Sequence, residues 1–411
     1  MKKVFYGWYI VLACVLIAAA GIGFHNTASI FVRPVTEDLG FSRGEFTFFR
    51  TIITILSAGL LPFYGKLAAR YSIKKIMLVG TSINGLTLMA YSFGTQLWHF
   101  YLIATVSGLF VNAGNFMIIG ILISRWFEDK KGLALGIAFA GSGFGAAIMN
   151  PMASHVIELY GWQMGYLFSG IAALVVLIPI VLFLVKDKPE DMGLEAYRLK
   201  DKTTTNVTST KSEGLTLAEA RKTPLFWLLA VALLGISVSA SAPNAHTVPY
   251  LSDLGYSAAM VSSVIAFSMV FLTVGKIFMG YVFDRFGILV GGLALGIFCI
   301  LSPTFALLAL NPAAPWLHAI FLGLASTGFS LTANIYAMNF FGNKDFPAIL
   351  SILSVITAIG AAFSPPLMGL AYDFLSSYTI AWIALVITGA IVTLCLAGAT
   401  IMNMKRSSNG N

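Results

Sequence analysis

The sequence has very little charge. Asp, Glu, Lys and Arg make up 10% of its 411 residues, while hydrophobic residue types make up 58%. Soluble domains carry about 25% charged residues, so this composition excludes an ordinary soluble protein. The apolar residues form runs of roughly 20–28 residues, long enough for the ~20-residue helix that crosses a bilayer core. Strands would be shorter and would alternate in polarity, so we predict helices.

Other absences exclude several classes of function. The sequence has no nucleophile elbow, phosphate-binding loop or metal-ligand cluster. The polar stretch 187–222 is too short to form the core of a catalytic domain. Its three cysteines (Cys14, Cys299 and Cys395) lie in apolar runs without metal or redox spacing. We therefore predict a protein that is not an enzyme and that uses no metal and no cofactor.

The apolar runs predict an all-α membrane protein with twelve transmembrane helices. The first run follows a basic start and resembles a signal peptide, but it continues to Phe31, so we interpret it as an uncleaved span. The predicted spans are 7–32, 45–66, 74–94, 97–124, 130–154, 163–186, 223–250, 258–283, 287–309, 315–341, 346–373 and 378–403.

Lys and Arg in the short loops predict the orientation, because these residues favour the cytoplasmic side. The loops on the opposite side hold only Arg33 and Arg43. Both termini are therefore expected to be cytoplasmic, in the bacterial cytoplasmic (inner) membrane. This topology explains the net charge of +8 without a nucleic-acid partner. The residues expected on the cytoplasmic side are Lys2, Lys3, Lys66, Arg70, Lys74, Lys75, Arg125, Lys130, Lys131, Arg285, Lys344, Lys405 and Arg406.

The two halves of the sequence repeat with a constant offset of 215 positions. The stretch at 33–42, RPVTEDLGFS, matches VPYLSDLGYS at 248–257; GKLAARYS at 65–72 matches GYVFDRFG at 280–287; and GAAIMNP at 145–151 matches GAAFSPP at 360–366. Six spans separate the copies, so both insert in the same orientation, which is the parallel repeat of secondary transporters. We predict two pseudo-symmetric six-helix bundles, 1–186 and 223–411, joined by a solvated cytoplasmic linker at 187–222.

The repeated loop resembles a family signature. The stretch GYVFDRFG is similar to the loop between helices 8 and 9 of the major facilitator superfamily, and GSGFGAAIMNP at 141–151 resembles its glycine-rich helix 5 motif. The resemblance implies the twelve-helix fold and a gating role for Gly65, Arg70, Gly280, Asp284 and Arg285. The first copy departs from the signature: Ala69 replaces its Asp and Ser72 its last Gly.

Further stretches are similar to one branch of that superfamily. SRWFEDKKGLALG at 124–136, KTPLFWLL at 222–229 and HTVPYLSDLGYS at 246–257 look like loops and helix ends of oxalate/formate antiporters and monocarboxylate porters. In those families a cation of helix 8, four residues before a Gly, pairs with the substrate carboxylate. Lys276 stands four residues before Gly280, so the resemblance implies that Lys276 binds substrate, where the family more often has Arg.

The depth of Lys276 within its predicted span also favours a functional role for this residue. The residue lies about two turns, roughly 9–12 Å, inside the predicted helix end, where a charge costs about 2.5–3.5 kcal/mol or more. The alternative is that its side chain extends to the headgroups and only packs. No Asp or Glu lies deep in a predicted span, so the site should prefer anions. A buried lysine can also release a proton, which makes Lys276 a possible coupling residue.

Two departures from the branch bear on mechanism. The proton-coupled porters have an Asp one turn before the helix 8 cation, where this sequence has Leu272. The oxalate/formate type has a second cation in helix 11, near Ala358, and here helix 11 is uncharged from 346 to 372. A single fixed cation favours a monocarboxylate over a dicarboxylate.

Polar residues of helices 1, 4, 7 and 10 complete the predicted site. They are Asn115, Tyr336, His25, Asn26 and His246. The histidines are also possible proton-coupling groups. Hydrogen bonding between helices is the alternative role for all of them. We expect His318, near a helix end, to be interfacial.

The sequence thus predicts a monomeric secondary transporter of small monocarboxylates of the lactate or pyruvate kind, working by alternating access with proton-linked symport. The expected partners are the carboxylate, a proton or counter-anion, and the lipid bilayer. Two alternatives remain: an anion exchanger of the oxalate/formate type, and a carboxylate sensor built on a transporter fold.

Overall fold

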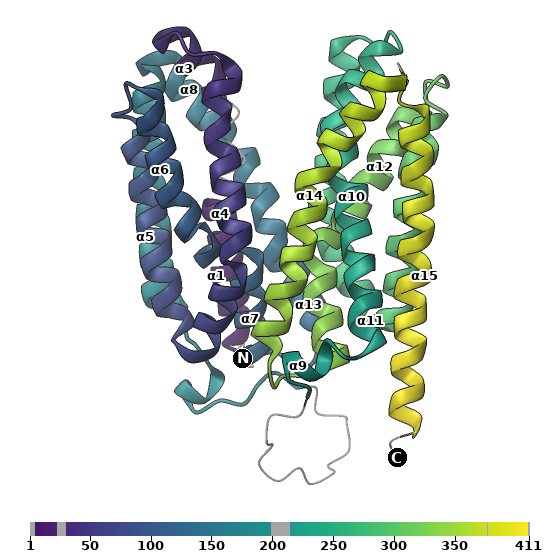
Figure 1. Ribbon diagram of the computed structural model, residues 1–411. Coiled ribbons are helices and arrows are strands. Elements are labelled where there is room, and N and C mark those ends of the chain that lie inside the picture. Colours follow the sequence, from purple (N-terminus) through teal and green to yellow (C-terminus); the bar gives the residue numbers. More distant parts are fainter. Residues whose placement is uncertain (1–4, 23–29, 199–213, 376, 410–411) are drawn as a thin grey trace. The chain divides into compact units, whose positions relative to one another are not determined.

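The computed structural model describes residues 5–22, 30–198, 214–375 and 377–409, which are mostly helical (Figure 1). The chain divides into two compact units. Unit 1 comprises Met1–Asp129 and Ile137–Lys200, and unit 2 comprises Lys130–Gly136 and Asp201–Asn411. The short segment Lys130–Gly136 therefore groups with unit 2, although the rest of its helix belongs to unit 1. The domain boundaries predicted at 186 and 223 stay a prediction.

The helices of unit 1 carry the first half of the sequence. They are α1 (Gly7–Ile17), η1 (Ala18–Ile22), α3 (Val32–Leu39), α4 (Arg43–Arg70), α5 (Ile73–Tyr91), α6 (Leu97–Phe110), η3 (Val111–Gly114), α7 (Phe116–Trp126), α8 (Lys131–Pro179), η4 (Ile180–Leu184) and η5 (Pro189–Met192). The helix α8 changes direction at Gly161, whose φ of 84° interrupts the helical backbone.

The helices of unit 2 carry the second half. They are α9 (Leu217–Ala220), α10 (Pro224–Asp253), α11 (Ala258–Leu307), α12 (Ala314–Ser326), α13 (Gly328–Phe341), α14 (Phe346–Leu375) and α15 (Thr379–Asn409). Like α8, α11 is interrupted by a glycine with positive φ, Gly287 at 81°.

Most described residues of each predicted span lie on these helices, and the exceptions lie mainly at span ends. The helices α8 and α11 each hold two spans, one before and one after the interrupting glycine. Eight helical segments in the described part of the chain are long and apolar enough to cross a membrane, and Gly7–Gly21 is a shorter apolar helix. The all-helical fold class is therefore confirmed. Parts of the predicted span 7–32 lie outside the described residues.

The internal repeat is visible in the backbone of each unit. Gly40, which ends α3, has a φ of 70°, and Gly255, 215 positions later, has a φ of 85°. Two residues after each glycine a serine caps the next helix: Ser42 accepts from the amide of Glu45, and Ser257 from that of Met260. Because glycine adopts positive φ without steric cost and serine is a preferred N-cap, the same sequence builds the same turn twice.

The second repeated loop differs between the units for a simple reason. Gly287 adopts a positive φ of 81°, whereas Ser72, at the equivalent position, has a φ of −62° and caps α5 by accepting from the amide of Lys75. An extended turn with a side-chain cap replaces the glycine turn. The departure of Ser72 from the family signature is therefore accommodated locally.

Small residues bring helices into backbone contact in unit 1. A β-carbon on Gly141 would meet the backbone of Val15, and one on Gly145 would meet the backbone of Ala19. The glycine-rich stretch at 141–151 thus lets α8 approach α1 and η1 as closely as their backbones allow, which confirms the packing expected from its composition.

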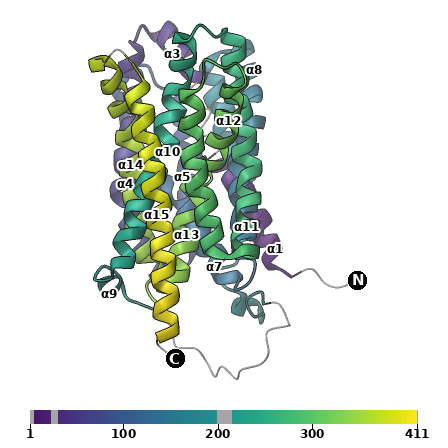
Figure 2. The ribbon, with the colours of Figure 1, turned by 90° about the vertical axis from the view of Figure 1, so that its right-hand side faces the viewer.

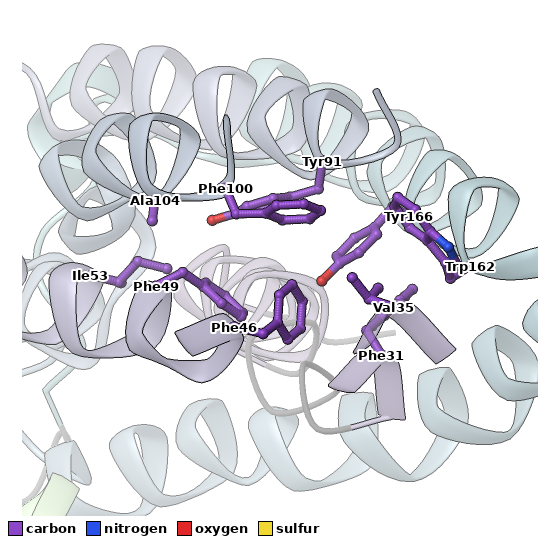
Figure 3. Close-up of a cluster of buried hydrophobic side chains, with 10 residues drawn as sticks. All are labelled: Phe31, Val35, Phe46, Phe49, Ile53, Tyr91, Phe100, Ala104, Trp162 and Tyr166. Carbon is purple, nitrogen blue, oxygen red and sulfur yellow. The ribbon is translucent and has the colours of Figure 1, made fainter. Parts of the chain in front are cut away.

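An aromatic cluster joins α3, α4, α6 and α8 in unit 1 (Figure 3). The rings of Phe31 and Tyr166 stack with centroids 3.8 Å apart. At its edge the indole of Trp162 donates to the carboxylate of Asp38 at 2.8 Å. This bond ties the turn at Gly40 to α8.

In unit 2, α11 packs along α12 and α15, and α10 packs along α14 (Figures 1 and 2). Glycines again set the separation: a β-carbon on Gly323 would meet the backbone of Ser268, and one on Gly389 the backbone of Cys299. The buried Cys299 is a packing residue at this contact, as expected from its apolar surroundings.

The two repeated turns can be tested by adding a β-carbon. We expect Gly40→Ala and Gly255→Ala each to lower the free energy of unfolding by about 1–2 kcal/mol, because the left-handed region is unfavourable for residues with a β-carbon. No other atom lies within 4 Å of either added carbon, so the cost is one of backbone conformation. Thermal unfolding of the purified protein in detergent measures the change.

Gly59→Ala is the matched control, because Gly59 lies inside α4 and is equally open. There the substitution should raise the free energy of unfolding by up to about 1 kcal/mol, since alanine favours a helix. A loss of similar size at all three positions would contradict the role given to the positive φ.

Candidate functional site

Lys276 is a buried cation inside a membrane-spanning segment. Lys276 is 5% exposed and lies on α11, within the apolar segment Ser263–Leu307. Among the residues whose burial the structure describes, no other lysine or arginine is buried, and no Asp or Glu is buried. A charge held at such a position usually has a functional partner.

The backbone around Lys276 is packed against the start of α8. A β-carbon on Gly136 would meet the carbonyl of Lys276, and one on Gly280 would meet the carbonyl of Gly132. Gly132 and Gly136 are one helical turn apart, as are Lys276 and Gly280. The two turns therefore contact each other along their backbones, in the manner of small-residue helix contacts in membranes.

Asp284 holds the beginning of α8. One carboxylate oxygen accepts from the amide of Gly132 at 2.8 Å and the other from the amide of Leu133 at 2.7 Å. The first amides of a helix have no intrahelical partner and carry partial positive charge, so a carboxylate from another helix stabilises them. Of the predicted gating residues, Gly280 and Asp284 meet at this contact.

The other predicted gating residues lie elsewhere. Arg285 is exposed beside Asp284, Gly65 is buried in α4, and Arg70 is exposed at the end of α4. Ala69 stands at the position of Asp284 in the first repeat and has no carboxylate with which to bind amides. Their gating role stays a prediction.

Predicted helix 4 is interrupted near its middle, whereas predicted helix 10 is not. Between α6 and α7 the chain forms the short η3 helix, and Asn115 is extended with a ψ of 168°. Between α12 and α13, Thr327 keeps helical backbone angles (φ −61°, ψ −33°), so the chain continues as a helix 215 positions after Asn112. Interrupted membrane helices often line the substrate site in transporters.

The side chain of Asn115 is engaged in this break. Its oxygen accepts from the amide of Phe116 at 2.7 Å, and its nitrogen donates to the side chain of Asn112 at 3.2 Å. Asn112 is buried and donates to the carbonyl of Ser57 in α4 at 2.6 Å, which fixes the break. Asn112 is not among the predicted site residues, although two amides three residues apart in an apolar helix were a usable signal.

Tyr336 lies in the core of unit 2. Its hydroxyl donates to the carbonyl of Ile288 at 2.7 Å, and its ring meets Phe283 edge-on. A β-carbon on Gly292 would meet the same hydroxyl. The group is thus used to join α13 to α11, which is the helix-packing alternative for this residue.

His246 connects α10 to α14 and to the residue preceding α15. Its Nε2 is 2.9 Å from the carbonyl of Pro365 and its Nδ1 is 3.1 Å from the hydroxyl of Tyr378. Because a carbonyl can only accept, Nε2 carries a proton. Nδ1 accepts from the tyrosine when the ring is neutral and donates to it when the ring is protonated, so both forms are satisfied.

The expectation for His318 was wrong. The residue is 1% exposed, its Nδ1 donates to the carbonyl of Ser302 at 2.8 Å, and its Nε2 lies 3.0 Å from the hydroxyl of Thr247. Its position near a helix end suggested an interfacial residue, but packing of α12 against α10 and α11 buries it. His25 and Asn26 lie outside the described residues.

Nothing in the described chain suggests a metal centre, since no group of three or more His, Cys, Asp or Glu side chains is placed to hold an ion. The described residues do contain one buried lysine, one helix interruption at Asn115 and a histidine that is hydrogen-bonded in either charge state.

Comparison with known proteins gives a family match and several distant relatives. The family model described as Major Facilitator Superfamily matches residues 11–343. The oxalate:formate antiporter of Oxalobacter formigenes is 24% identical over 285 residues, covering 68% of this chain and 64% of that protein. Monocarboxylate transporter 3 of Rattus norvegicus is 28% identical over 165 residues, covering 40% and 34%. These two matches span less than two thirds of either relative's length.

A longer match and two solved structures extend the likeness over nearly the whole chain. Monocarboxylate transporter 6 of Mus musculus is 22% identical over 398 residues, covering 91% of this chain and 82% of that protein. The E. coli fucose:proton symporter FucP has a TM-score of 0.68 at 15% identity, covering 96% of this chain and 99% of that one. The proton:xylose symporter XylE has a TM-score of 0.71 at 14% identity, covering 95% and 94%.

The position of Tyr336 gives a direct test of its role. We expect Tyr336→Phe to lower the free energy of unfolding by about 1 kcal/mol, the usual contribution of one hydrogen bond, and to leave the KM of uptake unchanged. Thermal unfolding and uptake kinetics measure the two effects. A raised KM with unchanged stability would instead show that the hydroxyl reaches the substrate, as the sequence predicts.

Proposed function

The chain belongs to the major facilitator superfamily, and from that premise we propose that it carries small monocarboxylate anions across a membrane by alternating access. It is a multi-pass membrane transporter and not an enzyme. The substrate, the coupling ion and the membrane are the parts that we propose.

The buried charge of Lys276 is the observation that carries the proposal. Holding an ammonium group in an apolar span is unfavourable by several kcal/mol, and no carboxylate is buried among the residues whose burial the structure describes. A substrate anion supplies a charge of opposite sign. A cationic substrate would need the reverse arrangement, with a buried carboxylate.

The names of the relatives support a carboxylate of this kind. Both an oxalate:formate antiporter and several monocarboxylate transporters are similar to this chain. One buried cation matches one carboxylate group, which favours a monocarboxylate such as lactate or pyruvate. The interruption at Asn115 supports a binding layer in helix 4, where α7 starts with amides that attract anions.

We also propose that transport is linked to protons. Leu272 replaces the acid that couples protons in similar porters, so the proton must bind elsewhere. His246 can gain one without losing a hydrogen bond, because Tyr378 both donates and accepts. Lys276 is the second candidate, since a lysine in apolar surroundings releases its proton more easily.

Anion exchange is the second candidate function. It is favoured by the likeness to the oxalate:formate antiporter, which covers 68% of this chain. An exchanger needs no proton site, and the replacement of the acid by Leu272 is compatible with that. Strict dependence on internal anion distinguishes it from symport.

The excess of Lys and Arg in alternate loops supports an orientation with both termini in the cytoplasm. By this proposal the Asp284 contact faces the cytoplasm of a bacterial cell, and the turns at Gly40 and Gly255 face outward.

Uptake into proteoliposomes tests the role of Lys276. We expect Lys276→Met to reduce uptake of labelled lactate, pyruvate or formate by at least about 100-fold, since removing one partner of a buried ion pair costs about 3–5 kcal/mol. An inward proton gradient should stimulate the wild type and not the variant. Intact uptake by the variant would refute the proposal.

Lys75→Met is the matched control, because it removes the same charge from an exposed position on α5 and should leave uptake unchanged. Lys276→Arg tests geometry: it keeps the charge and should retain part of the activity. Uptake only into vesicles preloaded with anion would support exchange instead of symport.

A further inference from the structure

The linker between the two halves was expected to be solvated, but its first described end is docked in unit 1. The amide of Tyr197 donates to the carbonyl of Trp126 at 2.9 Å, and the carbonyl of Tyr197 accepts from the amides of Glu128 and Asp129 at 3.1 Å each. These bonds form a parallel β-bridge between Tyr197 and Phe127. Both the amide and the carbonyl of Tyr197 are thus hydrogen-bonded to the loop at the end of α7.

Side chains add to this docking. The ring of Tyr197 lies 5.4 Å from Phe5, 6.3 Å from Trp8 and 5.7 Å from Phe127, measured between centroids. Next to it, Arg198 forms an ion pair with Glu128 at 2.8 Å. The exposed ion pair contributes little, so the aromatic contacts and the backbone bonds dominate.

The other end of the linker is docked in unit 2. Gly214 forms an antiparallel bridge with Gly342, and the amide of Leu215 donates to the carbonyl of Phe341 at 2.8 Å. The amide of Leu217 donates to the carboxylate of Asp345 at 3.0 Å and starts the short helix α9. Hydrogen bonds from Thr216 lower the pKa of Glu219, so the carboxylate half of the α9 cap is present at neutral pH and weakens as the pH falls through that lowered value.

The two docking loops are copies of each other in the internal repeat. Trp126 and Phe341 are 215 positions apart, as are Phe127 and Gly342. The linker segments that bind them are unrelated, since one pairs in parallel and the other antiparallel. Two different stretches of linker therefore bind the same loop in both halves.

The chain continues differently after each of these loops. Trp126–Asp129 lead directly into Lys130, whose φ of 59° turns the chain, and then into Gly132 and Leu133, whose amides donate to Asp284. The second loop leads into the start of α14, and the position that corresponds to Asp284 in the other repeat is Ala69. Of the two loops, only the first leads to a helix start whose amides are bound by a carboxylate, that of Asp284.

We propose that Tyr197 and Arg198 form a strap that positions the loop Trp126–Asp129 and so keeps the amides of Gly132 and Leu133 on Asp284. Tyr197 is a positioning residue: it acts through the loop and touches no substrate. Release of the strap loosens the helix start that Asp284 holds. The linker contact at the second loop has no such effect, because no acid stands at Ala69.

Hydrogen exchange of the full-length protein in detergent tests the strap without any substrate. We expect Tyr197→Ala to speed amide exchange in 128–133 by about tenfold, the factor that corresponds to ~1.4 kcal/mol. Tyr197→Phe keeps the ring and the backbone bonds and should leave exchange unchanged. Arg198→Gln removes only the ion pair and should speed exchange by about twofold.

If the Tyr197 contact and the Asp284 contact are coupled, each must stabilise the other by the same free energy. A contact that acts only locally would not show this reciprocal effect on exchange. We expect Asp284→Ala to speed exchange of the Tyr197 amide by the same factor by which Tyr197→Ala speeds exchange at Gly132 and Leu133. Asp345→Ala is the control at the second end: it should free the amide of Leu217 and leave exchange in 130–136 unchanged.

Two results would overturn the proposal. One is unchanged exchange at Gly132 and Leu133 when Tyr197→Ala has freed Glu128 and Asp129, because the loop would then not position the helix start. The other is an equal effect of Asp345→Ala on 130–136. Since exchange needs no transported solute, either result is independent of whether the substrate is a carboxylate.

Discussion

The close approach of helix backbones is the constraint on which the rest of this structure depends. In an apolar solvent, helices associate through van der Waals contact and not through the hydrophobic effect, so small residues at the contact decide how near they come. Gly141 and Gly145 do this for α8 in unit 1, and Gly323 and Gly389 for α12 and α15 in unit 2. At Gly132 and Gly136 the same constraint places the start of α8 against the carbonyl of Lys276.

That contact combines the three chemical features of the second repeat. A buried ammonium group, a glycine and a carboxylate follow one another along α11 at Lys276, Gly280 and Asp284, four residues apart in each step. They therefore share one side of the helix. The side chain of Lys276 is buried, while its backbone and the next turn fix the helix start that Asp284 binds. A change in the Asp284 contact is thus a change in the surroundings of the cation.

The two halves preserve a common scaffold and differ where the chemistry lies. The turns at Gly40 and Gly255 have the same φ sign and the same serine cap, and the loops at Phe127 and Gly342 bind the linker in the same place. The position equivalent to Lys276 is Leu61, a buried apolar residue, and the one equivalent to Asp284 is Ala69. Duplication accounts for the helices, and divergence of single residues accounts for Lys276 and for the helix start that Asp284 binds.

The sequence by itself determined the membrane class, the positions of the helices and the repeat, because long apolar runs permit only helices in a bilayer and a constant offset is visible without coordinates. It also singled out Lys276, since an isolated charge in such a run stands out. It did not determine which polar groups are used in packing: Tyr336 donates to Ile288, His318 is buried between helices, and Tyr197 is docked although it lies in a polar linker. Those roles depend on which residues distant in sequence become neighbours, and hydrogen bonds and ring contacts are satisfied only after the helices have packed.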